Sequence, residues 1–89
     1  MMNKKCTELN KLEGGDKFVI PGEIEDSGSA HSYCKLMHTF TVEAGMGIPD
    51  VRKGKVSYIE KGECINAIRE DVGAFVAIPH NEKVIRMLK

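Results

Sequence analysis

The sequence predicts a mainly β fold: a small antiparallel barrel or curled sheet of five or six strands, with a short helical turn near the N-terminus. Apolar and polar side chains alternate through YCKLMHTFTV, residues 33–42, with the two-residue period of a half-buried strand. The C-terminal stretch 65–89 divides at turn residues into short segments rich in β-branched and aromatic residues. A chain of 89 residues is short, so we expect a single domain over residues 1–89 with a small core.

The first third of the chain predicts a helical turn, a strand and a loop, in that order. Leu9 and Leu12 form a spaced apolar pair before the glycines at 14–15, which indicates one short helical turn and then a break. DKFVIP, residues 16–21, is typical of a strand that ends at its proline. Residues 22–32 are polar, acidic and rich in small turn residues, so we expect a loop there.

The predicted strand at 33–42 has two different faces. Its alternation assigns one set of side chains to the interior, namely Cys34, Leu36, Phe40 and Val42. The opposite face contains Tyr33, Lys35 and Met37, and we predict that these three form an exposed contact surface.

The middle of the chain predicts a long loop followed by a hairpin. Residues 43–54 contain three glycines and a proline, which interrupt the strand pattern. KVSYIE, residues 55–60, resumes it as a short strand. The glycine of EKGE, residues 60–63, suits a tight turn, so we expect 55–60 to pair with 63–70.

The segment that begins at Ile65 has two interpretations. Ile65, Ile68 and Val72 fit helical spacing, and Gly73 could follow the end of a helix. We favour a strand, because residues 71–73 suit a turn and the segments beyond it are short, apolar and bounded by Pro79 and Asn81.

The predicted C-terminal strands carry apolar residues on both faces. One face can fill the interior together with earlier strands, through Phe18, Leu36, Phe40, Ile65, Val76 and Ile78. Phe75, Ile85 and Met87 then face outward. Exposed apolar patches often mark interfaces, so we expect a homodimer or higher homo-oligomer through these three residues. The alternative is that a loop or the N-terminal segment covers the second face.

Composition disfavours several classes of protein. Thirteen basic residues balance thirteen acidic ones, which disfavours nucleic-acid binding. No apolar run approaches the roughly 20 residues that span a bilayer, and no signal peptide is evident, so we expect no membrane association. Three widely spaced cysteines are an odd set, which favours a cytoplasmic location. Cys34 and His38 would lie about 13 Å apart on a strand, too far for one metal ion, so we expect no metal and no cofactor.

The loop at 44–55 is the best candidate ligand site in the sequence. Gly45 and Gly47 can expose backbone N–H groups, and Arg52, Lys53 and Lys55 add positive charge, which together suit a phosphate-bearing ligand. An isolated Gly-x-Gly also occurs in ordinary solvated loops, so both interpretations stay open. No catalytic residues are evident: no cysteine–histidine or serine motif has the context that nucleophilic catalysis needs, and we expect no enzyme.

The order LEGGDKFVI, YCKLM and NAIREDVGAFVAIPHNEKVIRML resembles small uncharacterised β-barrel proteins of phages and prophages of Gram-positive bacteria. The resemblance covers about half the chain and carries over no catalytic residue, and the loops at 22–32 and 43–54 depart from it as inserts. It implies a phage-encoded binding protein that inhibits a host protein or host defence component in the cytoplasm. The alternative is an oligomeric protein that sequesters a phosphate-bearing signalling nucleotide. Nucleic-acid binding is a weaker alternative.

Overall fold

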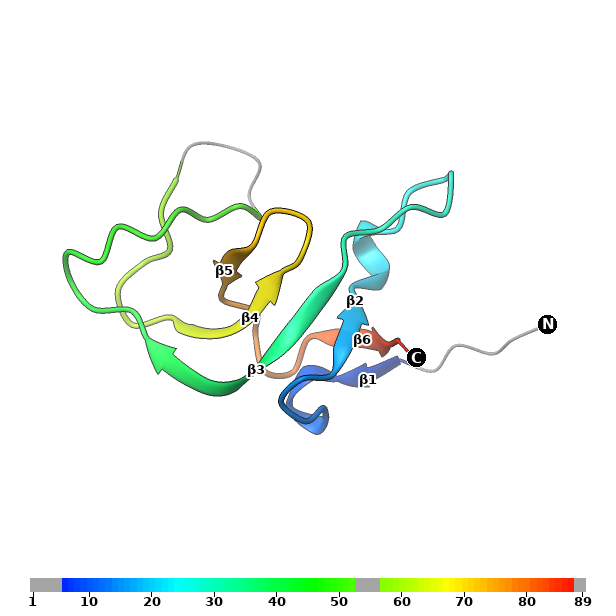
Figure 1. Cartoon of the computed structure of the whole chain (residues 1–89), viewed down its shortest axis with the longest axis horizontal. Helices are drawn as coiled ribbons and strands as arrows, with labels where there is room; N and C mark the ends of the chain where they lie inside the picture. The colour runs from blue at the N-terminus through cyan, green and yellow to red at the C-terminus, as the bar shows by residue number, and fades with distance from the viewer. Residues whose placement is uncertain (1–5, 53–56, 88–89) are drawn as a thin grey trace.

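The computed structural model describes residues 6–52 and 57–87, and in them it shows an open antiparallel sheet with the strand order β1-β6-β2-β3-β4-β5 (Figure 1). The strands are β1 (Cys6–Glu8), β2 (Lys17–Val19), β3 (Tyr33–Thr41), β4 (Cys64–Arg69), β5 (Ala74–Val76) and β6 (Lys83–Arg86). Two short 3₁₀ helices, η1 (Leu9–Lys11) and η2 (Pro21–Glu23), flank β2. The sheet curls without closing, because β1 and β5 remain its two edges.

The predicted β class is confirmed, and the strand interpretation of the segment after Ile65 is correct. The helical turn near Leu9 is also present, as η1. Strand β1 was not expected, since three residues are too few to show a period. Among the described residues no helix is long and apolar enough to cross a membrane.

The predicted hairpin between 55–60 and 63–70 is wrong. Strand β4 lies between β3 and β5, and the described part of 55–60 forms only an isolated bridge between Tyr58 and Pro49. The turn itself exists, because the Glu63 N–H donates to the Glu60 carbonyl and Gly62 has a φ of 95°. It returns the chain to β3, where the Val42 N–H donates to the Glu63 carbonyl at 2.8 Å.

A bulge bends β3 and exchanges its two faces. Lys35 pairs with Ala67 and Phe40 with Ile65, so five positions along β3 correspond to two along β4. Three extra residues are an odd number, and they reverse which side chains face inward. Tyr33 is therefore fully buried at the start of the strand, whereas its end buries the opposite set through Val42.

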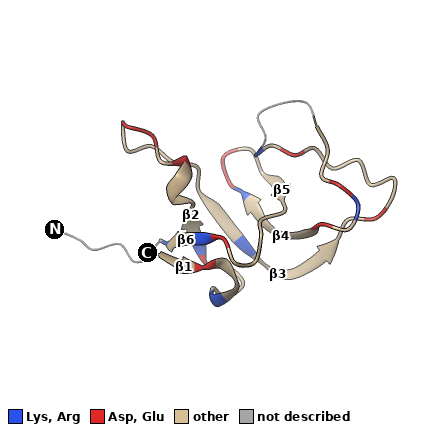
Figure 2. Cartoon of the chain, turned by 180° about the vertical axis from the view of Figure 1, so that it is seen from behind, with Lys and Arg blue, Asp and Glu red and all other residues tan. Residues whose placement is uncertain are grey.

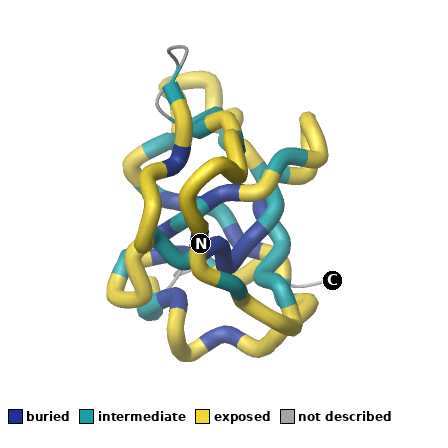
Figure 3. The backbone as a smooth tube through the Cα atoms, turned by 90° about the vertical axis from the view of Figure 1, so that its left-hand side faces the viewer, coloured by how far each residue is buried: buried dark blue, intermediate teal, exposed yellow. Residues whose placement is uncertain are grey.

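Two groups of buried side chains hold the sheet together. The larger group lies against the β2–β3 pair, where the Phe18 and Tyr33 rings stack with centroids 5.4 Å apart. The smaller group consists of Val42, Ile59 and Ile65, with Leu36, Phe40, Ile48 and Ala77 packed against it. Buried positions gather at the centre of the chain trace and exposed ones on the outer loops (Figure 3). Burial of each large side chain contributes about 1.5–3 kcal/mol.

Candidate functional site

The outer face of the sheet carries aligned apolar side chains. Residues directly opposite one another in neighbouring strands point to the same side. The strand register therefore aligns Cys34 with Ile68 and Ile68 with Phe75 across β3, β4 and β5. It aligns Cys6 with Ile85 and Ile85 with Val19 across β1, β6 and β2.

These residues and Met87 are here called the outer face. Phe75 and Met87 keep 41% and 42% of their surface exposed, Cys6 is exposed, and the other four are half-buried. Their neighbours along the same strands point to the opposite side of the sheet, and some of these, such as Phe18 and Val84, are fully buried. The two apolar sides that the C-terminal sequence indicated are thus a packed core and a face that is largely open.

A small polar group divides the outer face into two apolar halves. The Lys17 ammonium lies 3.3 Å from the Glu70 carboxylate, and the Ser32 hydroxyl donates to the same carboxylate at 2.8 Å. The Ser32 hydrogen bond, followed by the Lys17 contacts, holds the pKa of Glu70 below its usual value. Any partner that covers this face must therefore accommodate one acid–base pair near its middle.

Part of the surface around Phe75 is already covered. The Phe75 ring meets Phe40 edge to face, with centroids 5.4 Å apart. Phe40 in turn packs against the group that contains Ile59. The segment between β3 and β4 therefore covers the sheet next to Phe75, and the exposed surface continues from Phe75 toward Ile68 and Cys34.

A network of charged side chains ties three connecting segments to one end of the sheet. The Tyr33 hydroxyl donates to Glu23 at 2.8 Å, and Arg52 lies 3.5 Å from the second oxygen of that carboxylate. Burial, reinforced by the neighbouring Glu23, raises the pKa of Tyr33 to about 12. The network thus joins η2 to the segment that follows β3.

The same network continues to the turn between β4 and β5. Arg69 donates to both oxygens of Asp71, at 2.7 and 3.0 Å, and to the Val51 carbonyl at 3.2 Å. His31 lies 3.3 Å from Asp71, whose pKa is lowered chiefly by the Arg69 hydrogen bonds. Figure 2 shows acidic and basic segments side by side at this turn. The charges neutralise one another, so the network positions the loops and offers no surplus charge to a ligand.

The three residues predicted as an exposed surface on β3 have different surroundings. Tyr33 is fully buried, so its prediction as a contact residue is wrong; the bulge explains the error. Lys35 is half-buried, and its ammonium donates to the carbonyls of Leu9 and Leu12 at the end of η1. Met37 remains 79% exposed. Phe75, Ile85 and Met87, by contrast, all lie on the outer face.

The residues predicted to bind a phosphate do not converge in the part of the chain that the structure describes. Gly45 and Gly47 have φ values of 88° and 62° and are both exposed. Arg52 contacts Glu23 at the other end of this segment. Lys53 and Lys55 lie outside the described residues. Within residues 6–52 and 57–87, no three His, Cys, Asp or Glu side chains are placed to hold a metal ion.

Sequence reasoning missed a pocket of about 340 Å³ between the start of β4 and the segment after β5. Its walls come from two segments that are distant in sequence, 62–64 and 77–80, so no local motif could indicate it. The signal available in the sequence was Asn66, an asparagine flanked by apolar residues on both sides. Comparison with protein-family models, curated proteins and solved structures gives no match to this chain. Function is therefore inferred from the site itself.

Proposed function

We propose that this protein is a non-enzymatic binding module that holds a protein partner on the outer face of its sheet. One observation carries the proposal: on the side opposite the core, apolar side chains align across β1, β6 and β2 and again across β3, β4 and β5. Surfaces of this kind mark interaction sites in soluble proteins. Phe75 and Met87 are the most exposed large residues of the face and would be its anchors.

The partner should present an apolar surface with a polar centre. The Lys17–Glu70 pair lies between the two apolar halves, and a partner that left it without solvent or hydrogen bonds would lose affinity. The resemblance to phage proteins adds the proposal that the partner is a host protein or defence component, which binding would block. A cytoplasmic location in the host belongs to the same proposal.

Sequestration of a nucleotide by residues 44–55 has less support. Arg52 is the only one of the three predicted cations within the described residues, and its guanidinium faces Glu23. A phosphate would have to displace that carboxylate. Two exposed glycines alone are a weak anion site.

The proposal is tested by capture of partners from the natural host on the immobilised full-length protein. Phe75→Asp and Met87→Asp place a charge on the outer face. Ile24→Asp is the matched control, because Ile24 is 42% exposed but lies in the loop after η2. We expect both outer-face variants to lose at least tenfold in affinity for a captured protein, and the control to retain it. Equal retention by all three folded variants would refute the assignment of this face.

A further inference from the structure

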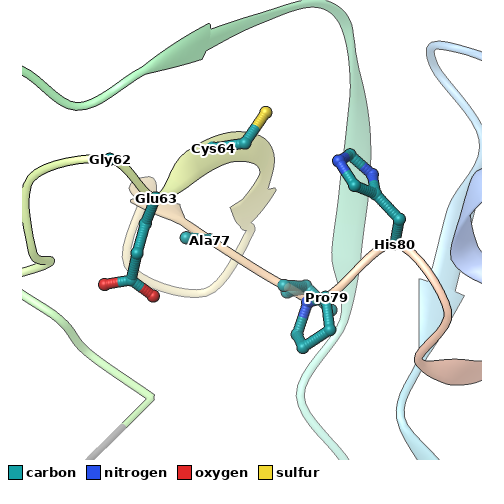
Figure 4. A pocket seen from close by; sticks show the side chains of 7 residues that line it. Gly62, Glu63, Cys64, Ala77, Pro79 and His80 are labelled. Atoms are coloured by element: carbon teal, nitrogen blue, oxygen red, sulfur yellow. The ribbon is translucent and has the colours of Figure 1, made fainter.

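The pocket of about 340 Å³ lies apart from the outer face and has its own chemistry. It is lined by Gly62, Glu63, Cys64, Ala77, Ile78, Pro79 and His80 (Figure 4). Its volume is at the lower end of the range for small-ligand sites, roughly 300–1,000 Å³. It therefore suits a small ligand, such as a single ring.

The pocket exists because the start of β4 extends beyond the part of the strand that pairs with β5. Backbone pairing stops at Ala67 and Val76. Beyond that point the Asn66 side chain takes the place of a strand partner: its Nδ2 donates to the Ile78 carbonyl at 2.6 Å, and its Oδ1 accepts from the Ile78 N–H at 3.1 Å. The side chain fixes the spacing between the two segments, and among the described residues no strand pairs with the start of β4 on this side.

The backbone of Cys64 faces this gap. Cys64 is the partner of Thr41, and the Val42 N–H donates to the Glu63 carbonyl at 2.8 Å. In an antiparallel ladder this pattern makes Thr41 and Cys64 a non-hydrogen-bonded pair, whose N–H and C=O groups point away from each other's strand. The Cys64 N–H and C=O therefore point from β3 toward the pocket.

The rest of the lining is mainly apolar. Ala77, Ile78 and Pro79 form one wall, and Figure 4 shows Glu63 and His80 on opposite sides. A carboxylate oxygen of Glu63 already accepts the Glu60 N–H at 2.8 Å. The pocket thus offers one donor and one acceptor from a single residue, beside apolar walls.

We propose that this pocket binds a planar amide that presents an N–H and a C=O side by side, as a lactam ring or a primary carboxamide does. The amide N–H would donate to the Cys64 carbonyl, and its oxygen would accept from the Cys64 N–H. Asn66, two residues after Cys64, already pairs its side-chain amide with the backbone N–H and C=O of Ile78 in this way. The fold therefore contains one example of an amide bound by both backbone groups of a single residue. His80 is exposed at the rim and would contact the outer edge of the ligand.

The test follows backbone amide chemical shifts of the full-length protein during titration with uracil, which carries the required pair of groups. The control ligand is uracil methylated on both ring nitrogens, which keeps the ring but cannot donate. We expect saturable shifts at residues 62–64 and 77–80, and affinity about tenfold weaker for the methylated ring, since one buried hydrogen bond is lost. Ala77→Leu narrows the pocket and should abolish the uracil shifts, whereas Ala44→Leu, in an exposed loop, should not.

A second pair of probes identifies the source of the amide. Acetyl-Ala-Asn-Ala-N-methylamide carries a primary carboxamide only in its Asn side chain, and the Asp version of the same peptide carries none. Selective shifts from the Asn peptide assign the site to a side chain of a polypeptide, and shifts from uracil assign it to a free lactam. Equal affinity for uracil and its methylated form together with no preference for the Asn peptide, or shifts confined to the outer face, would overturn the proposal. None of these outcomes depends on the protein partner proposed above.

Discussion

The side-chain amide of Asn66 forms two hydrogen bonds with the backbone of Ile78, at 2.6 and 3.1 Å, and is 99% buried. An amide side chain has both a donor and an acceptor, so it can satisfy both backbone groups of one residue. Asn66 thereby extends the sheet past the last rung between β4 and β5. The arrangement explains why a polar residue lies between the buried side chains of Ile65 and Ala67.

Replacing Asn66 should therefore destabilise the fold. Asn66→Ala leaves the N–H and C=O of Ile78 without partners, and each unsatisfied buried group costs about 1–3 kcal/mol. We expect the free energy of unfolding in urea to fall by about 2–4 kcal/mol. Asn10→Ala, at an exposed position in η1, is the control and should change it by less than about 0.5 kcal/mol. A fall no larger than that of the control would show that the amide is dispensable.

Two glycines with different surroundings provide a second matched pair. A Cβ atom at Gly14 would lie 2.5 Å from the Met37 Cα and 2.9 Å from its Cγ, whereas one at Gly22 would meet nothing within 4 Å. Gly14→Ala should therefore push the β3 bulge outward and cost about 1–3 kcal/mol of unfolding free energy. Gly22→Ala should be tolerated within about 0.5 kcal/mol. Similar thermal midpoints for the two variants would contradict the close packing of Gly14 on β3.

The bulge also marks the limit of what the sequence could predict. Alternation along residues 33–42 correctly indicates a strand, and turn residues correctly separate β4, β5 and β6. Alternation alone does not reveal which face is buried, and a bulge of three residues reverses that face within the strand. Tyr33 was therefore assigned outward although it is fully buried.

The same limit applies to the candidate sites. Local alternation predicts that Phe75, Ile85 and Met87 face outward, because residues next to them in the sequence are expected to face the interior. Arg52 was assigned to an anion site because its partner, Glu23, lies far away in sequence. Contacts between loops depend on the packing of the whole sheet, which local periodicity does not encode.

Tyr33 should make the stability of the protein depend on alkaline pH. Its pKa rises from 10.0 to about 12 on folding, so the folded state retains the proton that the unfolded state loses. Stability from this group is complete below pH 10 and is lost as pH rises toward 12. Between about pH 9 and about pH 11 the loss should be about 1 kcal/mol.

Tyr33→Phe isolates this effect in urea unfolding. Near neutral pH it removes the hydrogen bond to Glu23 and should cost about 1–3 kcal/mol. The difference from the unmodified protein should then narrow by about 1 kcal/mol at high pH, because phenylalanine has no proton to lose. Tyr58→Phe, at a side chain that is 58% exposed, should change neutral-pH stability by less than about 0.5 kcal/mol. A constant difference across the alkaline range would rule out Tyr33 as the source.

We expect the outer face to pair two copies of this chain when nothing else covers it. Ile85 lies on β6, the middle strand of the β1–β6–β2 half of the outer face, between Cys6 and Val19. It is half-buried within one chain. A second copy on the same face would bury Ile85 together with Met87 and Phe75, and each large side chain removed from water contributes up to about 1.5–3 kcal/mol. We expect light scattering to report a dimer at micromolar concentration. Ile85→Glu should give a folded monomer, because two carboxylates would meet in an apolar interface, while Ile24→Glu, away from this face, should remain dimeric. If the unmodified protein is monomeric throughout this range, the outer face does not bind a second copy.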